Sequence, residues 1–192
     1  MLRITQALGI GFSVPSAVAN TGFGYIANMI EAGRGRDYNV RNLQRAYAMT
    51  MGSVSTSPET YSGDRVATRN TINELSKKYA IGTPPIEQRP QTNYRKFGKK
   101  NIFGRIKSGK SLEERAYVMM EKTEYMNQAT QMAAMMLSTE VVMKDGTKTN
   151  LLEVYNNSDL SIDNVTQYKI YGGDSFREFD EAQFIVYVKN VV

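Results

Sequence analysis

The longest regular pattern of apolar and polar positions in the chain lies between Leu112 and Ser138. Apolar residues recur there every three or four positions, which is the spacing of one face of an α-helix. Ser111 can cap the first turn, and Glu113 and Glu114 lie where the helix dipole favours negative charge. No proline or glycine interrupts the run. The pattern therefore predicts a helix of about seven turns, at roughly 3.6 residues each.

The apolar side of this predicted helix is rich in methionine. An unbranched thioether adapts to irregular gaps, so such a face suits packing against exchangeable neighbours. An ordinary core helix is the commoner explanation of an apolar stripe. Our interpretation of the chain as an assembly module nevertheless requires that this helix and its neighbours bury their apolar sides largely against other polypeptides.

Downstream of the helix, the pattern predicts a β-hairpin followed by a short helix. Residues 140–144 are β-prone, and Asp145-Gly146 is the kind of pair that tolerates the backbone of a tight turn. Residues 147–149 are the expected returning strand. Asn150 can then cap a helix over residues 151–155.

The last thirty or so residues carry a mixed pattern. Residues 160–171 read as short extended pieces. Ser175 and Glu178 have the spacing of a capping box, which predicts a final helix over residues 176–190. The chain ends on Val192 without a helix stop signal, as expected for a piece of a longer protein.

Two shorter helices are predicted upstream from their capping residues. Asn39 can cap a helix that runs through Met51, and Asp64 can cap one over residues 65–79. The second has a thin apolar edge, so its basic residues are expected to face solvent or a partner. Together the patterns predict a mainly α fold. We expect an extended helical assembly module with a small β-hairpin, and not a self-contained globule.

Composition divides the chain into three predicted regions. Residues 1–81 form an apolar and helical N-terminal region. Residues 82–110 form a linker with a basic stretch, because Pro84 and Pro85 remove amide donors and hold the chain extended. Residues 111–192 contain the methionine-rich helix, the hairpin and the C-terminal helix.

Residues 1–30 are apolar but interrupted by small and polar residues. Residues 1–20 imitate a secretory signal, with Arg3 near the start and a short apolar centre. Glycine, serine and proline thin that centre, so we do not expect a secretory signal. A membrane-spanning helix needs about 20 apolar residues, and membrane contact is therefore the less favoured alternative. We expect the small residues to allow close packing against neighbouring chains.

The composition excludes several classes of chemistry. The 192 residues include no histidine, cysteine or tryptophan. Thiolate or imidazole sites for zinc or haem cannot be built, nor can a Cys-His or Ser-His nucleophile. Any general acid or base would have to be a carboxylate, a lysine or a tyrosine. We expect neither enzymatic activity nor a cofactor.

A basic stretch follows the prolines and contains no acidic residue between Gln88 and Leu112. Aromatic residues are interleaved with the cations, as in segments that follow a phosphate backbone and stack on bases. Docking on an acidic protein surface and a solvated loop are equally open alternatives. The eight candidate binding residues are Arg89, Arg95, Lys96, Lys99, Lys100, Arg105, Lys107 and Lys110.

The end of the basic stretch matches the glycine-rich phosphate loop of nucleotide-binding proteins. Its candidate residues are Gly104, Gly109, Lys110 and Ser111. In such a loop backbone amides hold phosphates, the lysine reaches the outer phosphates and the serine holds Mg²⁺. Residues 99–103 offer two consecutive apolar residues where a buried parallel strand needs a longer run. A nucleotide-binding protein is therefore an alternative and not our main expectation.

The segment TEYMNQATQMAAMMLSTEVVMKDGTKTNLLEVYNN, residues 123–157, resembles an element of the very large internal virion proteins of crAss-like and related tailed bacteriophages. The residues that carry the resemblance are Glu124, Tyr125, Asn127, Gln128, Asp145, Gly146, Leu151 and Tyr155. It implies a structural cargo or ejection protein, located in the virion, whose partners are other virion proteins and packaged DNA. A nucleic-acid-binding module that uses residues 89–110 is the second hypothesis.

Overall fold

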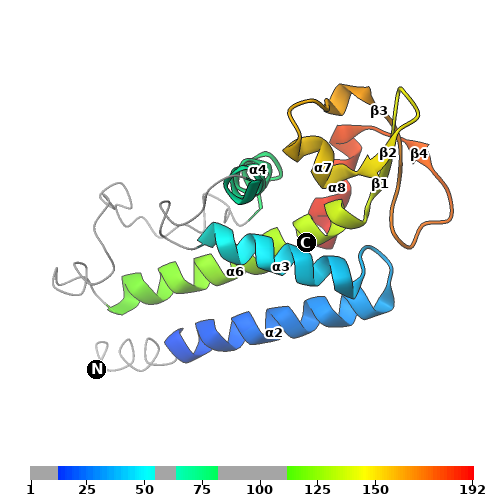
Figure 1. Ribbon diagram of the computed structural model, residues 1–192. Coiled ribbons are helices and arrows are strands. Elements are labelled where there is room, and N and C mark those ends of the chain that lie inside the picture. The colour runs from blue at the N-terminus through cyan, green and yellow to red at the C-terminus, as the bar shows by residue number, and fades with distance from the viewer. Residues whose placement is uncertain (1–12, 55–63, 82–111) are drawn as a thin grey trace.

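The computed structural model describes residues 13–54, 64–81 and 112–192 (Figure 1). In these residues the chain is mainly helical and carries one small antiparallel sheet, which confirms the predicted fold class. The helices are α2 (Ser13–Arg34), α3 (Val40–Val54), α4 (Asp64–Lys78), α6 (Leu112–Ser138), α7 (Leu151–Asn156) and α8 (Glu181–Val191). The strands are β1 (Glu140–Met143), β2 (Lys148–Asn150), β3 (Val165–Lys169) and β4 (Arg177–Glu178).

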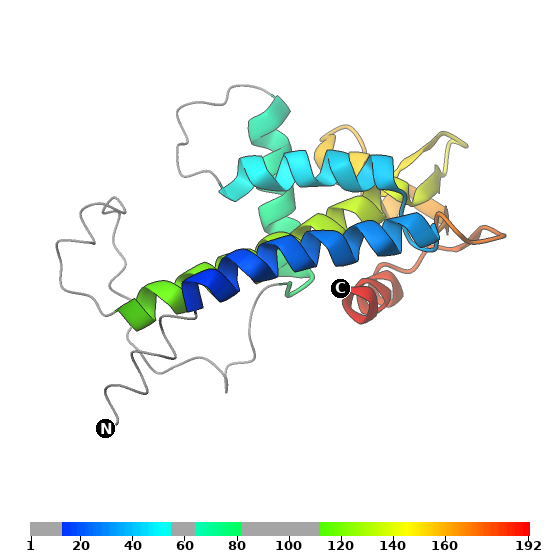
Figure 2. The ribbon, with the colours of Figure 1, turned by 90° about the horizontal axis from the view of Figure 1, so that it is seen from below.

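The long helices α2, α3 and α6 form one end of the fold, with α2 and α3 both packed along α6 (Figures 1 and 2). A Cβ added at Gly24 of α2 would meet the Asn127 side chain of α6 at 1.9 Å, so this glycine permits the close approach. Gly24 thus packs within its own chain, whereas the prediction was that the small residues pack against neighbouring chains. The Tyr25 and Tyr47 rings, 5.1 Å apart, join α2 to α3.

Polar contacts set the position of α3 against α6. The Thr50 and Thr130 hydroxyls share a buried hydrogen bond of 2.7 Å. At the other end of α3, the Asn42 side chain donates to the Leu137 carbonyl at 3.2 Å, where α6 ends. The predicted cap at Asn39 is confirmed, because its side chain accepts from the Asn42 amide at 2.7 Å.

The sheet has the strand order β2-β1-β3-β4, and all its neighbours are antiparallel. The predicted hairpin forms β1 and β2. Gly146 has a φ of 83°, and the Asp145 carboxylate accepts from the Thr147 amide at 2.8 Å. Both residues therefore act in the turn as expected. Strand β3 falls within the extended pieces predicted for residues 160–171, whereas β4 and the pairing of both strands with the hairpin were not predicted.

The helix that follows the hairpin is capped as predicted, whereas the last helix is not. The Asn150 side chain accepts from the Glu153 amide at 2.9 Å at the start of α7. Helix α8 begins at Glu181, later than the capping-box prediction, because Glu178 pairs with Gln167 in the sheet. The Asp180 carboxylate accepts from two amides of the first turn and is the actual cap.

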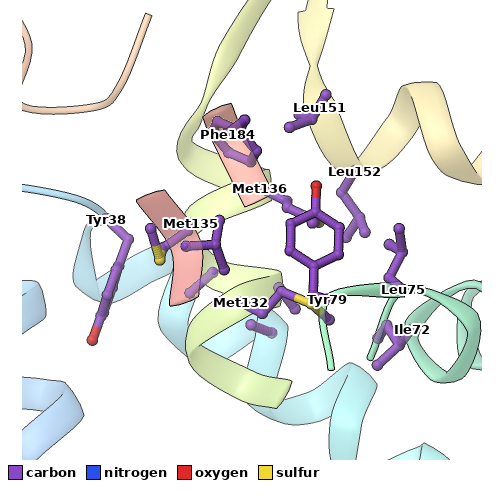
Figure 3. Close-up of a cluster of buried hydrophobic side chains, with 14 of the residues drawn as sticks. Tyr38, Ile72, Leu75, Tyr79, Met132, Met135, Met136, Leu151, Leu152 and Phe184 are labelled. Atoms are coloured by element: carbon purple, nitrogen blue, oxygen red, sulfur yellow. The ribbon is translucent and has the colours of Figure 1, made fainter. Parts of the chain in front are cut away.

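Three methionines of α6, Met132, Met135 and Met136, lie in the core of their own chain (Figure 3). All five residues from Met132 to Met136 are buried, so the helix is enclosed on every side at this level. Around them lie Tyr38, α4, the leucines of α7 and Phe184 of α8. The expectation that this helix buries its apolar side largely against other polypeptides is wrong for residues 129–136.

Helix α4 ends in a motif that normally uses glycine. The Ile81 amide donates to the Ser76 carbonyl at 2.8 Å, and the Ala80 amide donates to the Lys77 carbonyl at 3.1 Å. This pair of bonds is the Schellman motif. In this motif the first residue beyond the helix cap adopts the left-handed backbone conformation. Ala80 occupies that position with a φ of 51°. Its Cβ makes the conformation costly, by roughly 1–2 kcal/mol.

Replacing Ala80 with glycine should therefore stabilise the protein, by about 0.5–1 kcal/mol after the greater freedom of glycine in the unfolded chain is counted. The matched control is Ala48→Gly at an exposed position within α3. That change should destabilise the protein by about 1 kcal/mol. Urea unfolding of both variants measures the two signs, and a destabilised Ala80→Gly variant would contradict the assignment.

Candidate functional site: the polar cluster on α8 and the outer face of α2

All the residues for which the sequence predicts DNA, acidic-partner or phosphate binding lie between Arg89 and Ser111. This range falls outside the residues that the structure describes. The basic stretch, the phosphate-loop match and the linker boundaries therefore stay predictions. The described residues contain two other features with functional potential, a polar cluster and an apolar surface.

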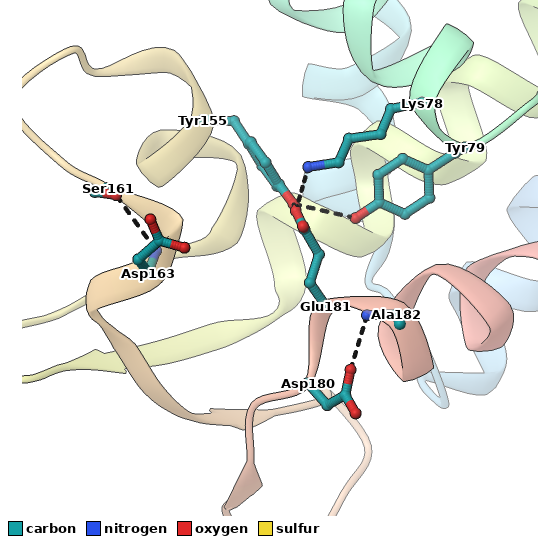
Figure 4. A network of polar contacts seen from close by, with 8 residues as sticks. All are labelled: Lys78, Tyr79, Tyr155, Ser161, Asp163, Asp180, Glu181 and Ala182. Atoms are coloured by element: carbon teal, nitrogen blue, oxygen red, sulfur yellow. Dashed lines mark hydrogen bonds and ion pairs between the residues drawn. The ribbon is translucent and has the colours of Figure 1, made fainter.

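The polar cluster joins three helices through four side chains (Figure 4). The Glu181 carboxylate of α8 accepts from Lys78 of α4 at 2.5 Å, and it also accepts from the Tyr155 hydroxyl of α7. The Tyr79 hydroxyl lies 3.4 Å from that of Tyr155. Lys78 is further placed over the Tyr155 ring, 5.4 Å from its centre. The Schellman motif ends α4 at this point and so fixes the backbone that carries Lys78 and Tyr79.

The protonation states of the cluster follow from its burial and its partners. Burial raises the pKa of Tyr79 to about 12. The pKa of Tyr155 is raised further, first by burial and then by the neighbouring Tyr79 and Glu181. Burial alone would raise the pKa of Glu181, but hydrogen bonds from Lys78 and Tyr155 outweigh it and lower the pKa. The cluster therefore holds an ionised carboxylate between two protonated donors.

A second contact holds the same helix from the other side. The Tyr187 hydroxyl of α8 donates to the Asp37 carboxylate, which lies in the loop between α2 and α3. Burial and the Asp37 carboxylate raise the pKa of Tyr187, so this phenol also stays protonated. Helix α8 is thus fastened to α4 and α7 through Glu181 and to the α2–α3 loop through Tyr187.

The arrangement suits fastening better than acid–base catalysis. A general base needs a pKa near the working pH, whereas the phenols of Tyr79, Tyr155 and Tyr187 have raised pKa values. The Glu181 carboxylate is already satisfied by two donors. Among the described residues, no group of three acidic side chains is placed to hold a metal ion.

Sequence reasoning did not find this cluster. No pattern in the sequence predicted that Glu181 binds Lys78 or that Asp180 caps α8. Sequence reasoning used Tyr155 only as a residue that carries the family resemblance. Lys78, Tyr155 and Glu181 have no shared spacing in the chain, so no local pattern points to their contact.

The apolar surface lies on the outer side of α2, and we call it the α2 outer face. Phe23, Ile26 and Ile30 are 68%, 54% and 56% exposed. Their spacing of three and four residues places them on one side of the helix. Asn28 and Ala32 are buried on the opposite side, against the rest of the fold. Figure 2 shows α2 in front of α3 and α6, with its outer side turned away from them.

Comparison with protein-family models, with curated proteins and with solved structures finds no match. Among the helices in the described ranges, none combines the length and the apolar character needed to cross a membrane. Any function assigned to the two candidate sites therefore has to be argued from the chemistry of their own residues.

Replacing Glu181 with glutamine should lower the stability of the protein at neutral pH by about 1–2 kcal/mol, because a partly buried charge-assisted bond is lost. The lowered pKa of Glu181 means that its carboxylate stabilises the fold above the unfolded-state pKa, which is about 4.3. This contribution is lost as the pH falls through the folded-state pKa. The stability difference between the two proteins should therefore shrink at acidic pH.

Thermal unfolding at a series of pH values measures this difference. Glu74→Gln, at an exposed position of α4, provides a matched control that should leave stability nearly unchanged. A Glu181→Gln difference that stays constant down to strongly acidic pH would show that the carboxylate charge does not fasten α8.

Proposed function

We propose that this chain is a structural assembly component of a tailed-phage virion, which contacts other virion chains through the α2 outer face. The observation that carries the proposal is the exposure of Phe23, Ile26 and Ile30 along one side of α2. Single exposed apolar side chains are common on soluble proteins. Three large ones in a continuous helical row form a patch of the kind that marks contact surfaces.

The polar content of α2 supports the same proposal. A helix that faces water usually carries charged residues on its outer side. Helix α2 has no charged residue from Ser13 through Ile30, and Glu31 and Arg34 pair with each other at its end. Covering apolar surface contributes about 25 cal/mol per Å² removed from water. A partner would therefore gain stability from this face without having to desolvate a charge.

The virion setting rests on the resemblance of residues 123–157 to the internal proteins of tailed phages. The elements in that segment support the resemblance, since a methionine-rich helix leads through a short strand and an Asp-Gly turn to a capped helix. Leu151 lies buried at the start of that helix, and Tyr155 lies in the polar cluster. The segment is thus a supporting framework, whereas α2 offers the contact surface.

A single introduced cysteine can test whether the α2 outer face is covered in particles, because the chain contains no cysteine. Ile26→Cys should react with a maleimide severalfold more slowly in intact phage particles than after the particles are disrupted. Val186→Cys on α8 is the matched control, since Val186 is 57% exposed and Ile26 is 54% exposed. Its reaction should change little on disruption.

Two results would contradict the proposal. One is the absence of the chain from purified particles. The other is that Ile26→Cys reacts equally fast in intact and in disrupted particles. Either result would remove the structural role assigned to the α2 outer face.

DNA binding is the second candidate function, and the basic stretch favours it. Eight cations and no acid between Gln88 and Leu112 provide a dense positive charge for phosphates. The remaining residues sum to a charge of −3, because 5 − 8 = −3. Attraction to DNA would therefore come from this stretch and not from the whole chain.

Retention on DNA should weaken steeply as the salt concentration rises. Neutralising four of the cations should make the slope of log binding constant against log salt concentration shallower, by up to about one unit per lost phosphate contact. The test variant replaces Arg95, Lys96, Lys99 and Lys100 with glutamine. Its control replaces Arg41, Arg45, Lys144 and Lys189, which are exposed elsewhere and leave the same net charge. Equal loss of retention in both variants would argue against a DNA site in the basic stretch.

A further inference from the structure

Five of the exposed residues of α2 follow the spacing of a coiled-coil seam. The exposed positions Ala19, Phe23, Ile26, Ile30 and Gly33 are separated by four, three, four and three residues. Alternating steps of three and four are the a and d positions of a heptad. Such a row is complementary to another helix that carries the same spacing, because each side chain fits between those of the facing helix.

The charge distribution makes a second copy of the same helix a suitable partner. With no charged residue from Ser13 to Ile30, two copies of this face can meet without like charges opposing each other. Two-fold pairing is the commonest arrangement of identical chains, and it needs a surface that is complementary to itself. An uncharged row of apolar residues meets that need.

Charge and shape together favour an antiparallel pair. The Arg34 and Arg36 side chains are 66% and 79% exposed where α2 ends. Parallel helices would bring these cations of both copies together. They would also place both sheets at the same end, since the sheet lies beside the α2–α3 loop (Figure 1). Antiparallel helices keep the cations and the sheets apart.

One antiparallel register matches large residues with small ones. It places Phe23 of each copy opposite Gly33 of the other and Ile26 opposite Ile30. A Cβ added at Gly33 would find no atom within 4 Å, so the space above this glycine is open for a large side chain. Alternating large and small residues across a seam allows close packing.

We propose that two copies of this chain pair through antiparallel α2 helices, with Phe23, Ile26, Ile30 and Gly33 as the seam. This inference rests on the proposed role of the α2 outer face and names its occupant. A contact confined to a few helical turns falls at the low end of interface sizes, below about 1,200 Å² in total. The pair is therefore a reversible dimer whose population depends on concentration.

Sedimentation equilibrium of the full chain over a wide concentration series tests the pairing. The unaltered chain should pass from monomer to dimer, and Ile26→Asp should weaken association by at least about tenfold, which corresponds to about 1.4 kcal/mol. Val186→Asp makes the same change at an equally exposed site on α8 and should leave association unchanged. Circular dichroism should show all three proteins folded, because both altered side chains are exposed.

Disulfide formation between two single-cysteine variants tests the orientation. A disulfide requires Cα atoms about 4.4–6.8 Å apart. When Ile26→Cys and Ile30→Cys chains are mixed and oxidised, the antiparallel register predicts more cross-link between the two variants than within either one. Cross-links mainly within each variant would indicate parallel helices and would overturn the proposed orientation.

A chain that remains monomeric at every concentration would overturn the pairing, as would Ile26→Asp associating like the unaltered chain. Slow reaction of Ile26→Cys in particles would then still support the proposed function, with a different virion chain as the occupant. Fast reaction of that cysteine in particles, combined with a dimer in solution, would retain the pairing and reject the virion contact. The two proposals can therefore fail separately.

Discussion

Enclosure of α6 between Met132 and Met136 is the packing constraint on which the rest of the fold depends. An α-helix usually buries one stripe and leaves the other side in water, but here helices from both halves of the sequence surround one turn and a half. Methionine suits this position because its flexible thioether fills the unequal gaps left by helices that cross at different angles. The buried Thr50–Thr130 hydrogen bond adds a directional contact to this otherwise adaptable packing.

The central position of α6 also explains how the other helices and the sheet are arranged around it. Because α6 takes the central place, α2 packs on it through one side, at Gly24, and keeps Phe23 and Ile26 outside. The sheet and α8 close the other end, where the Tyr168 and Phe184 rings pack edge to face at 5.6 Å. The contacts of Glu181 and Tyr187 then hold α8 in place. The surface proposed for assembly thus lies on the outer side of α2, and the buried side of the same helix adds Ala32 to the core.

Local signals in the sequence predicted several of the elements, but not helix α2 or strand β4. The periodicity of α6, the Asp145-Gly146 turn and the Asn150 cap all act within a few residues, and each was confirmed. Glu178 misled the prediction of α8, because pairing with Gln167 across the sheet outweighed a local capping preference. The Glu181 cluster joins residues that are distant in the chain, and no periodicity encodes such contacts. The basic residues, which provided the clearest charge signal, lie outside the described part of the chain.

The burial of three α6 thioethers also makes those methionines less accessible to oxidants than an exposed methionine. Oxidation to the sulfoxide turns a flexible apolar side chain into a polar one and requires access by the oxidant. Met51 is 46% exposed on α3, whereas Met132, Met135 and Met136 are buried. Peroxide would therefore modify Met51 while the fold stays closed. Sulfoxide at Met135 would form only in molecules whose core has opened, and it would then hinder their return to the native packing.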